Sequence, residues 1–205
     1  MQKRFFPILV AISVMLGMGF LAACTGPAGP VGPPGPPGWE HLMPLPELAK
    51  ITSPIEVTWL GHAAFKLSIA EGKVVLVDPW ITGNPKTPIK DLAAFLTTFK
   101  EAKAIIILVT HDHFDHLGDT VAIAKDTTIG IKVKVVATPE TTAKLIKAGV
   151  KKDQALYGIG MNIGGSVELE KITISMVQAL HTSETGVPTG YVIKFPGEAT
   201  IYHAG

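Results

Sequence analysis

Short apolar runs and amphipathic segments alternate along much of the chain after residue 54. Residues 104–109 form an apolar run that is rich in β-branched side chains and short enough to be a buried strand. Residues 91–100 instead place Leu92, Phe95, Leu96 and Phe99 at helical spacing, which predicts a helix with one apolar face. Strands that alternate with helices predict an α/β fold with a mainly parallel or mixed sheet covered by helices.

The remaining elements follow from the same pattern. Up to residue 150 it predicts further strands at 55–60, 64–70, 73–77 and 133–137, and helices at 119–126 and 139–148. From residue 154 it predicts strands alone, at 167–170, 172–180, 190–195 and 200–203. Two loops with glycine and proline, at 82–88 and 183–189, are candidates to border a substrate entrance.

Candidate metal ligands are concentrated immediately after the strand predicted at 104–109. They are His111, Asp112, His113, Asp115 and His116. Imidazole and carboxylate are ligands of borderline or hard divalent cations. Two residues apart in a looped backbone, His111 and His113 can turn toward one point, whereas Asp115 and His116 can face a second point nearby. The loop therefore predicts two half-sites for two metal ions, which together activate water at neutral pH. The alternative is a solvated histidine-rich loop or an adventitious metal-binding tag.

The amino terminus has the features of an export signal. Lys3 and Arg4 precede an apolar segment, and small residues follow it in the sequence Leu21-Ala22-Ala23-Cys24. This sequence resembles the lipobox of bacterial lipoproteins, whose cysteine is lipidated and becomes the first residue. Cys24 is the only cysteine, so an intramolecular disulfide is excluded. We expect residues 1–23 to be a signal peptide and the protein to be an exported lipoprotein, anchored on the periplasmic or cell-surface side. An uncleaved membrane anchor is the alternative.

Residues 24–50 are expected to be a linker. Between residues 26 and 38 glycine occupies every third position and proline lies between, which is the collagen pattern. Four such triplets are few for a triple helix, so we expect a stiff polyproline-II spacer. A trimer formed through this segment is the alternative, and the oligomeric state stays open.

The net charge of the chain without its predicted signal peptide indicates which classes of binding partner to expect. Without residues 1–23, which hold one lysine and the only arginine, 16 basic residues stand against 17 acidic ones, a formal charge of −1. A near-neutral chain without a basic tract argues against nucleic acid as a partner. Without arginine, the usual bidentate clamp for phosphate is absent, which favours a small-molecule substrate other than a phosphodiester.

The motif His111-x-His113-x-Asp115-His116 after one strand, with His181 after a later one, resembles the metallo-β-lactamase-fold hydrolases. Residues 59–65, 75–79 and 202–205 resemble the flanking motifs of the branch similar to ascorbate-6-phosphate lactonase. The resemblance covers about residues 55–205. It implies that residues 51–205 form a domain of this kind, an αββα sandwich that hydrolyses a small molecule.

The resemblance also implies a role for each candidate residue. His111, His113 and His181 would bind one metal ion, and Asp115 and His116 would bind a second. Zinc is expected, and manganese or iron are alternatives.

Further residues are implied to surround the ligands. His62, Asp78 and His203 would support them or contact the substrate; His62 and His203 have structural roles as alternatives. A carboxylate such as Asp78 at a strand end can fix the tautomer of a ligand imidazole. Asp115 is also a candidate catalytic group. Asp112 is a candidate to pass a proton to the leaving group, unless it is a solvated loop acid.

In these hydrolases an aspartate that follows the equivalent of Ala204-Gly205 bridges both metal ions, and a later histidine completes the second site. The sequence ends at Gly205, so we expect a fragment of a longer protein, with an incomplete second β-layer and only two ligands for the second ion. A naturally truncated, inactive version is the alternative.

The expected activity is hydrolysis of a lactone, ester or amide by a metal-activated water. Two alternatives remain, a phosphoester or phosphodiester hydrolase of the same fold and a non-enzymatic metal- or ligand-binding lipoprotein.

Overall fold

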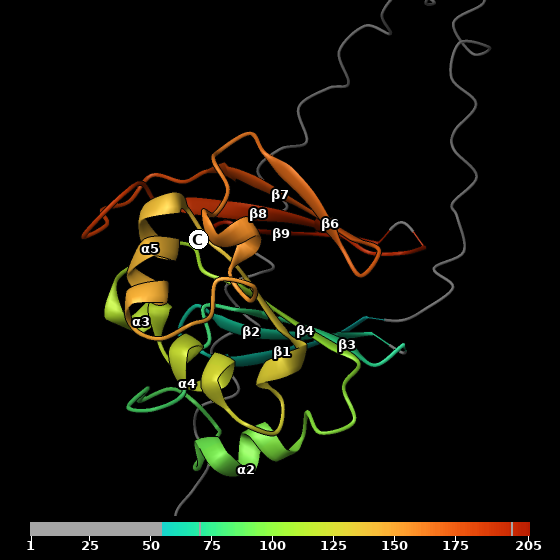
Figure 1. Ribbon diagram of the computed structural model, residues 1–205. Helices are drawn as coiled ribbons and strands as arrows, with labels where there is room; N and C mark the ends of the chain where they lie inside the picture. Colours follow the sequence, from blue (N-terminus) through green and yellow to red (C-terminus); the bar gives the residue numbers. More distant parts are fainter. Residues whose placement is uncertain (1–54, 70, 198) are drawn as a thin grey trace, which may run out of the picture. The chain divides into compact units, whose positions relative to one another are not determined.

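The computed structural model describes residues 55–69, 71–197 and 199–205. These residues form a five-stranded sheet with the order β1-β2-β3-β4-β5 and a four-stranded sheet with the order β6-β7-β8-β9 (Figure 1). The predicted signal peptide, Cys24, the whole predicted linker (24–50) and residues 51–54 of the expected domain lie outside the described residues. None of the helices within the described ranges has the length and hydropathy needed to cross a bilayer.

The elements follow the chain in an order close to the predicted one. The strands are β1 (Ile55–Gly61), β2 (Ala64–Ile69), β3 (Lys73–Val77), β4 (Ala104–Leu108), β5 (Val133–Val136), β6 (Ser166–Leu169), β7 (Ile172–Gln178), β8 (Thr189–Lys194) and β9 (Thr200–His203). The helices are α2 (Leu92–Thr97), α3 (Phe114–Leu117), α4 (Thr120–Lys125) and α5 (Pro139–Lys147), with short 3₁₀ turns at η2 (Gly130–Lys132) and η3 (Leu156–Gly158).

The first sheet is mixed, as the sequence predicts. Strands β1, β2 and β3 pair antiparallel, whereas β3, β4 and β5 pair parallel. Successive side chains of β4 point to opposite faces, so Ile105 and Ile107 pack with the helices while Ile106 and Leu108 pack with the second sheet. Both faces of the strand are therefore covered, which is why every position of this run is apolar.

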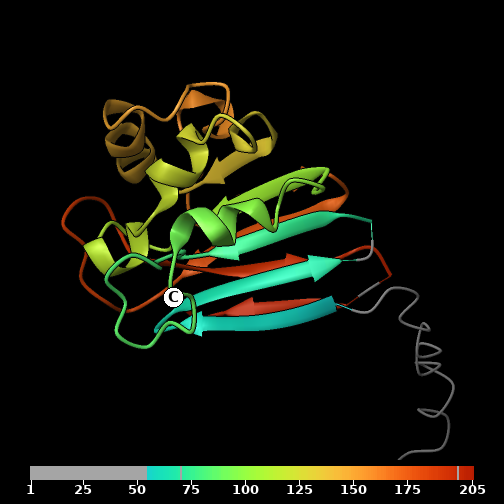
Figure 2. The ribbon, with the colours of Figure 1, turned by 90° about the horizontal axis from the view of Figure 1, so that it is seen from below.

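Helices cover one face of the first sheet and the second sheet covers the other (Figures 1 and 2). Phe95 of α2, Ile123 of α4 and Leu145 of α5 belong to the core on the helical side. Ile174 of β7 and Ile193 of β8 belong to the core between the sheets. This order of helix layer, sheet and sheet confirms the α/β sandwich with a mixed sheet that is expected from the sequence.

A close backbone approach fixes the loop after β4 against the segment after β3. Gly118 ends α3 with φ +47°, and a Cβ atom there would lie 2.5 Å from the carbonyl oxygen of Pro79. Asp119 donates its backbone N–H to the same oxygen over 2.8 Å. Only glycine fits at this position, because a side chain would push the two segments apart.

Two predictions about local structure need correction. The strand predicted at 172–180 ends at Gln178, because its partner β8 begins with Thr189, the residue opposite Gln178. His181 therefore lies in the connection between β7 and β8 rather than at a strand end. The short helix α3, which holds Asp115 and His116, was not predicted, since four residues carry too little periodicity to reveal a helix.

Candidate metal centre

The candidate site lies where β3 and β4 end. These strands are parallel neighbours, so the residues that follow them, Asp78 and Thr110, meet at one edge of the sheet. The backbone N–H of Thr110 donates to Asp78 Oδ1 over 2.8 Å, and its hydroxyl donates to Asp78 Oδ2 over 2.7 Å. Both residues are fully buried. This pair holds the beginning of the histidine-rich loop to the end of β3.

The first histidine group consists of His111, His113 and His181. One ring nitrogen from each lies within 4.8 Å of the other two. His111 Nε2 and His113 Nδ1 are 3.0 Å apart, and the ring of His181 meets the His111 ring edge-on with centroids 4.9 Å apart. Residues separated by about 70 positions in the sequence thus present nitrogen atoms to one point.

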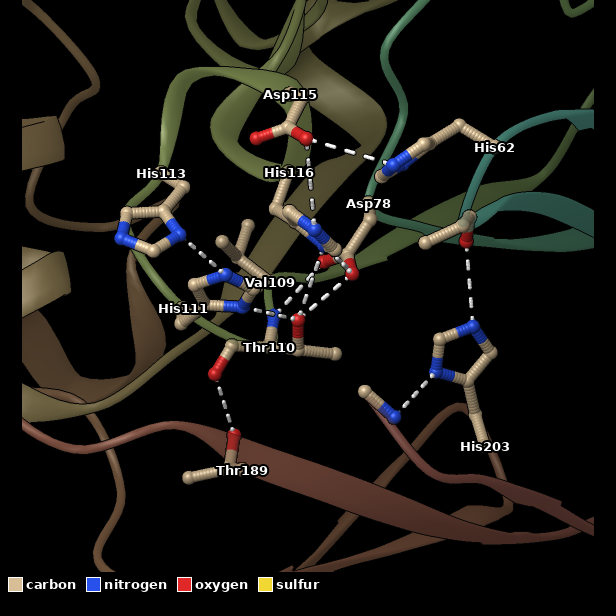
Figure 3. A network of polar contacts seen from close by, with 12 residues as sticks. His62, Asp78, Val109, Thr110, His111, His113, Asp115, His116, Thr189 and His203 are labelled. Atoms are coloured by element: carbon tan, nitrogen blue, oxygen red, sulfur yellow. Dashed lines mark hydrogen bonds and ion pairs between the residues drawn. The ribbon is translucent and has the colours of Figure 1, made fainter. Parts of the chain in front are cut away.

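The second histidine group consists of His62, Asp115 and His116. Its donor atoms also lie within 4.8 Å of one another. His62 Nε2 is 3.4 Å from Asp115 Oδ2, and His116 Nε2 is 4.0 Å from the same oxygen (Figure 3). The sequence predicts two ligands here, with His62 only nearby, whereas the structure adds the His62 ring as a third donor.

The hydrogen-bond network assigns the tautomers of two rings. A carboxylate only accepts, so His116 donates its Nδ1–H to Asp78 Oδ2 over 2.7 Å and turns the lone pair of Nε2 toward Asp115. Because the Thr110 hydroxyl donates to Asp78, its oxygen accepts from His111 Nδ1–H over 3.0 Å. The lone pair of His111 Nε2 then faces His113. Both rings present the form that a cation needs.

The donor set therefore fits a divalent cation at each group. Three imidazole nitrogens in the first group, and two imidazoles with one carboxylate in the second, are donor sets that zinc and other borderline divalent ions take in proteins. Burial, together with the neighbouring His116 ring, lowers the pKa of His111 to about 4. His111 is therefore neutral near pH 7, as a metal ligand must be.

Bonds between the two sheets hold this edge of the molecule together. Thr189 of β8 donates both its backbone N–H and its hydroxyl to the carbonyl oxygen of Thr110, each over 2.9 Å. The Tyr191 hydroxyl donates to the carbonyl oxygen of Val109 over 2.8 Å. Burial raises the pKa of Tyr191 well above its usual value, so this hydroxyl keeps its proton.

Asp112 differs from the solvated acid or proton donor considered in the sequence analysis. Its carboxylate is buried and accepts hydrogen bonds from Ser183, Glu184, Thr185 and Lys144. Burial alone raises the pKa of Asp112, but the bonds from Ser183 and Thr185 together with Lys144 hold it well below its usual value. A carboxylate that stays ionised and is surrounded by donors does not shuttle protons, so we assign it a structural role.

A cavity of about 1130 Å³ opens beside both groups. It is lined by His62, Phe65, His111, Asp115, His116, Leu180, His181, Tyr202, His203 and their neighbours. His203 lines this space but belongs to neither histidine group. It donates its Nε2–H to the carbonyl oxygen of Ala63 over 3.2 Å (Figure 3). Its ring thereby joins β9 to the turn that carries His62.

The two loops considered for the substrate entrance lie elsewhere. Most of residues 82–88 line a separate cavity of about 570 Å³ together with the start of α2. Residues 183–185 bind Asp112, and the main cavity is lined only as far as His181 on this connection. Supporting residues such as Thr110, Thr189 and Lys144 were also missed by the sequence analysis, because a single polar residue in an element carries no sign of its partner.

Comparison with known proteins agrees with this geometry. Residues 73–205 match the family model described as the beta-lactamase superfamily domain. The chain is 44% identical over 152 residues to a UPF0173 metal-dependent hydrolase of Pyrobaculum islandicum, which covers 74% of this chain and 61% of that protein. A UPF0173 metal-dependent hydrolase of Caldivirga maquilingensis is 48% identical over 149 residues, covering 72% and 57%.

A solved structure is similar as well. Igni18, described as a novel metallo hydrolase from Ignicoccus hospitalis, superposes with a TM-score of 0.60 at 33% identity, covering 74% of this chain and 60% of that one. The chain thus spans about three fifths of the length of these relatives.

Proposed function

This chain belongs to the beta-lactamase superfamily, and we propose that it is a metal-dependent hydrolase acting on a lactone, ester or amide. The observation that carries the proposal is the cavity of about 1130 Å³ that both histidine groups line. Relatives of this chain are named metal-dependent hydrolases, and the first histidine group has the donors that such a centre requires.

His111, His113 and His181 would hold one cation, and His62, Asp115 and His116 would hold another. Bound there, the cations would supply a water molecule whose pKa is lowered from about 15.7 toward roughly 7 and a Lewis acid for the carbonyl of the substrate. Zinc suits the donors, and manganese or iron are the alternatives. No serine or cysteine nucleophile is needed in this chemistry.

The residues of the chain prepare the site before substrate arrives. Asp78 and Thr110 keep His116 and His111 in the tautomers whose Nε2 atoms are free to act as ligands. The Asp115 carboxylate lines the cavity and is about a quarter exposed, so it can orient the attacking water and accept its proton. Leu180 and Tyr202 give the same cavity apolar surface for the body of the substrate.

The charge of the cavity favours a carbonyl substrate over a phosphoester. Among the described residues that line it there is no lysine. Lys144, on the nearby helix α5, already donates to Glu184 over 2.6 Å and to Asp112 over 3.2 Å. A free cationic side chain would help the bound cations to hold an anionic phosphoester, whereas a neutral lactone, ester or amide needs none.

The test measures metal content and hydrolysis in the same preparations. We expect the wild-type protein to bind two equivalents of zinc and to hydrolyse p-nitrophenyl acetate or a simple lactone faster than bis-p-nitrophenyl phosphate. His113→Ala should lose about one equivalent and at least a hundredfold in kcat/KM. Lys147→Ala, at the exposed end of α5, is the matched control and should behave as wild type. A His113→Ala protein with the wild-type hydrolysis rate would refute the catalytic assignment.

Metal content also separates the enzyme from a binding protein. Two equivalents of metal without hydrolysis of any substrate class would favour the non-enzymatic alternative, a metal- or ligand-binding lipoprotein. More turnover of the phosphodiester than of the carbonyl substrates would favour the phosphoester alternative.

We also propose that the protein is exported and anchored to the membrane through a lipid on Cys24. The support is the sequence alone, a basic and then apolar amino terminus that ends in Leu21-Ala22-Ala23-Cys24. Cells that express the protein with radioactive palmitate should label the wild type and leave Cys24→Ser unlabelled. Equal labelling of both proteins would refute the anchor.

A further inference from the structure

His181 reaches the first histidine group from a long connection. Strand β7 ends at Gln178 and β8 begins at Thr189, so ten residues lie between the strands. At the base of this connection the Ala179 N–H donates to the Pro188 carbonyl oxygen over 3.4 Å. Within the described ranges, no hydrogen bond from another residue holds the His181 ring itself. The ring meets those of His111 and His113 edge-on, and the backbone on either side sets how it reaches them.

The backbone after His181 is fastened to Asp112. Both carboxylate oxygens are used: Oδ1 accepts from the Ser183 hydroxyl over 2.6 Å and from the Glu184 N–H over 2.7 Å. Oδ2 accepts from the Thr185 hydroxyl over 2.7 Å. Asp112 lies between His111 and His113 in the sequence, so the backbone that carries two ligands also holds the loop that carries the third.

Helix α5 supports the same loop from the side. Lys144 donates to Asp112 Oδ2 and to Glu184 Oε2, and thus bridges the two acidic residues. The bond to Glu184 raises the pKa of Lys144, so the bridge stays charged. At Gly186, the loop comes so close to α5 that an added Cβ atom would lie 2.7 Å from Glu140 Oε2.

The energetics favour a loop with one position. A buried carboxylate is costly without partners, and here three residues of the loop together with Lys144 supply them. Hydrogen bonds to an ionised group are among the stronger ones in proteins, so releasing the loop would cost the Asp112 carboxylate its bonds from Ser183, Glu184 and Thr185. Ser183 is only two residues from His181, which leaves little chain in which that ring could move away.

We propose that Asp112 and Lys144 are positioning residues, which hold the His181 ring in place to complete the first histidine group. This inference rests on the proposed function, in which that group binds a metal ion. Neither residue contacts the substrate or the cation in this arrangement. Asp112 and Lys144 hold Ser183, Glu184 and Thr185, and these residues set the position of the backbone that carries His181.

The test removes the contacts of the loop without touching any ligand. The double variant Ser183→Ala/Thr185→Val deletes both hydroxyl donors, and Lys144→Met deletes the ammonium group. The rescue variant Ser183→Thr/Thr185→Ser keeps both hydroxyls. Lys147→Met is the matched control for Lys144→Met, because it removes an exposed lysine from the same helix. Asp112→Ala is avoided, since it would remove the buried acceptor that the loop and α5 share and so change both sets of contacts at once.

Two measurements follow each variant. In the full-length protein, Co²⁺ titration followed by visible absorption reports on both groups, and the part of the signal that is lost in His113→Ala reports on the affinity of the first group. We expect affinity to fall about 10- to 100-fold in the double variant and less in Lys144→Met. In the metal-free protein with ¹³C-labelled histidine, the ring signal of His181, identified by its loss in His181→Gln, should shift or broaden. The rescue and control variants should match wild type in both measurements.

The two proposals fail in different ways. Wild-type Co²⁺ affinity and an unchanged His181 signal in the double variant would overturn the positioning role and leave the proposed hydrolase intact. A wild-type protein that binds no Co²⁺ would overturn the metal centre, while the His181 signal in metal-free variants would still decide whether Asp112 orders the loop.

Discussion

The two histidine groups contain similar donors but are built differently. In the second group, His116 is held directly by the buried carboxylate of Asp78, and the hydrogen bond fixes its tautomer. In the first group, His111 is held in a similar way through Thr110, but His181 depends on a loop fastened two residues away. The second group is therefore supported by a side chain that contacts a ligand ring, Asp78 on His116. In the first group, the support of His181 acts through the loop backbone that Asp112 holds.

This difference indicates where each group is sensitive to change. Support that touches a ring fixes orientation and protonation together, so its loss should affect both folding and metal binding. Support that passes through a loop mainly sets the position of a ligand, so its loss should affect metal binding more than folding. The first group should thus be the easier of the two to weaken without unfolding the domain.

The largest effect is expected from Asp78→Ala. The change leaves the Thr110 N–H, the Thr110 hydroxyl and the His116 ring without their buried acceptor. We expect the free energy of unfolding, measured by urea denaturation of the metal-free protein, to fall by about 3–5 kcal/mol. Asp91→Ala removes the exposed carboxylate that caps α2 and should cost only about 1 kcal/mol. If Asp78→Ala and Asp91→Ala lowered the free energy of unfolding by similar amounts, the hydrogen bond from His116 to Asp78 would not be the strong support of the second group that we expect.

The pH dependence of stability tests His111 in the first group. Its pKa is about 4 in the folded chain and near its ordinary value of 6.5 when unfolded. Below pH 6.5 His111 takes up a proton in the unfolded state but stays neutral in the folded state down to about pH 4. The free energy of unfolding of the metal-free protein should therefore fall by up to about 3 kcal/mol between pH 6.5 and 4.

Urea denaturation at a series of pH values measures this loss. His111→Gln should flatten the pH dependence across that range. Asp112 contributes to the pH dependence in a different range. Because its pKa is lowered in the folded state, the stability that it provides is lost only below about pH 4. A slope unchanged by His111→Gln would show that another group is responsible.

The smallest effect is expected at the turn that carries His62. Trp59 donates its Nε1–H to the His62 carbonyl oxygen over 2.8 Å, while about half of the side chain is exposed. Trp59→Phe should therefore lower stability by less than about 1 kcal/mol and weaken binding of the second cation a few-fold, with the first unaffected. Tyr157→Phe, at an exposed aromatic position, is the control. Equal weakening of both cations in Trp59→Phe would show that the groups are not independent.

Much of the fold was predictable from the sequence. The run from Ala104 to Leu108 is apolar at every position because both of its faces are covered, and the local pattern contains that information. Helix ends were also predictable where a cap is present, as with Pro139 in the first turn of α5. The four residues of α3 were not, since one turn of helix shows no period.

In the candidate site, too, some residues were predictable from the sequence and others were placed only by the tertiary structure. The sequence by itself determined that His111, His113, Asp115 and His116 lie together, because six consecutive residues after a strand cannot move far apart. Only the tertiary structure decided that His62 joins Asp115, that Ser183 is bound by Asp112, and that Lys144 bridges that carboxylate to Glu184. These contacts join segments 32 to 71 residues apart in the sequence. Sheet pairing and core packing bring such segments together, and no local pattern of side chains records the partner that each will meet.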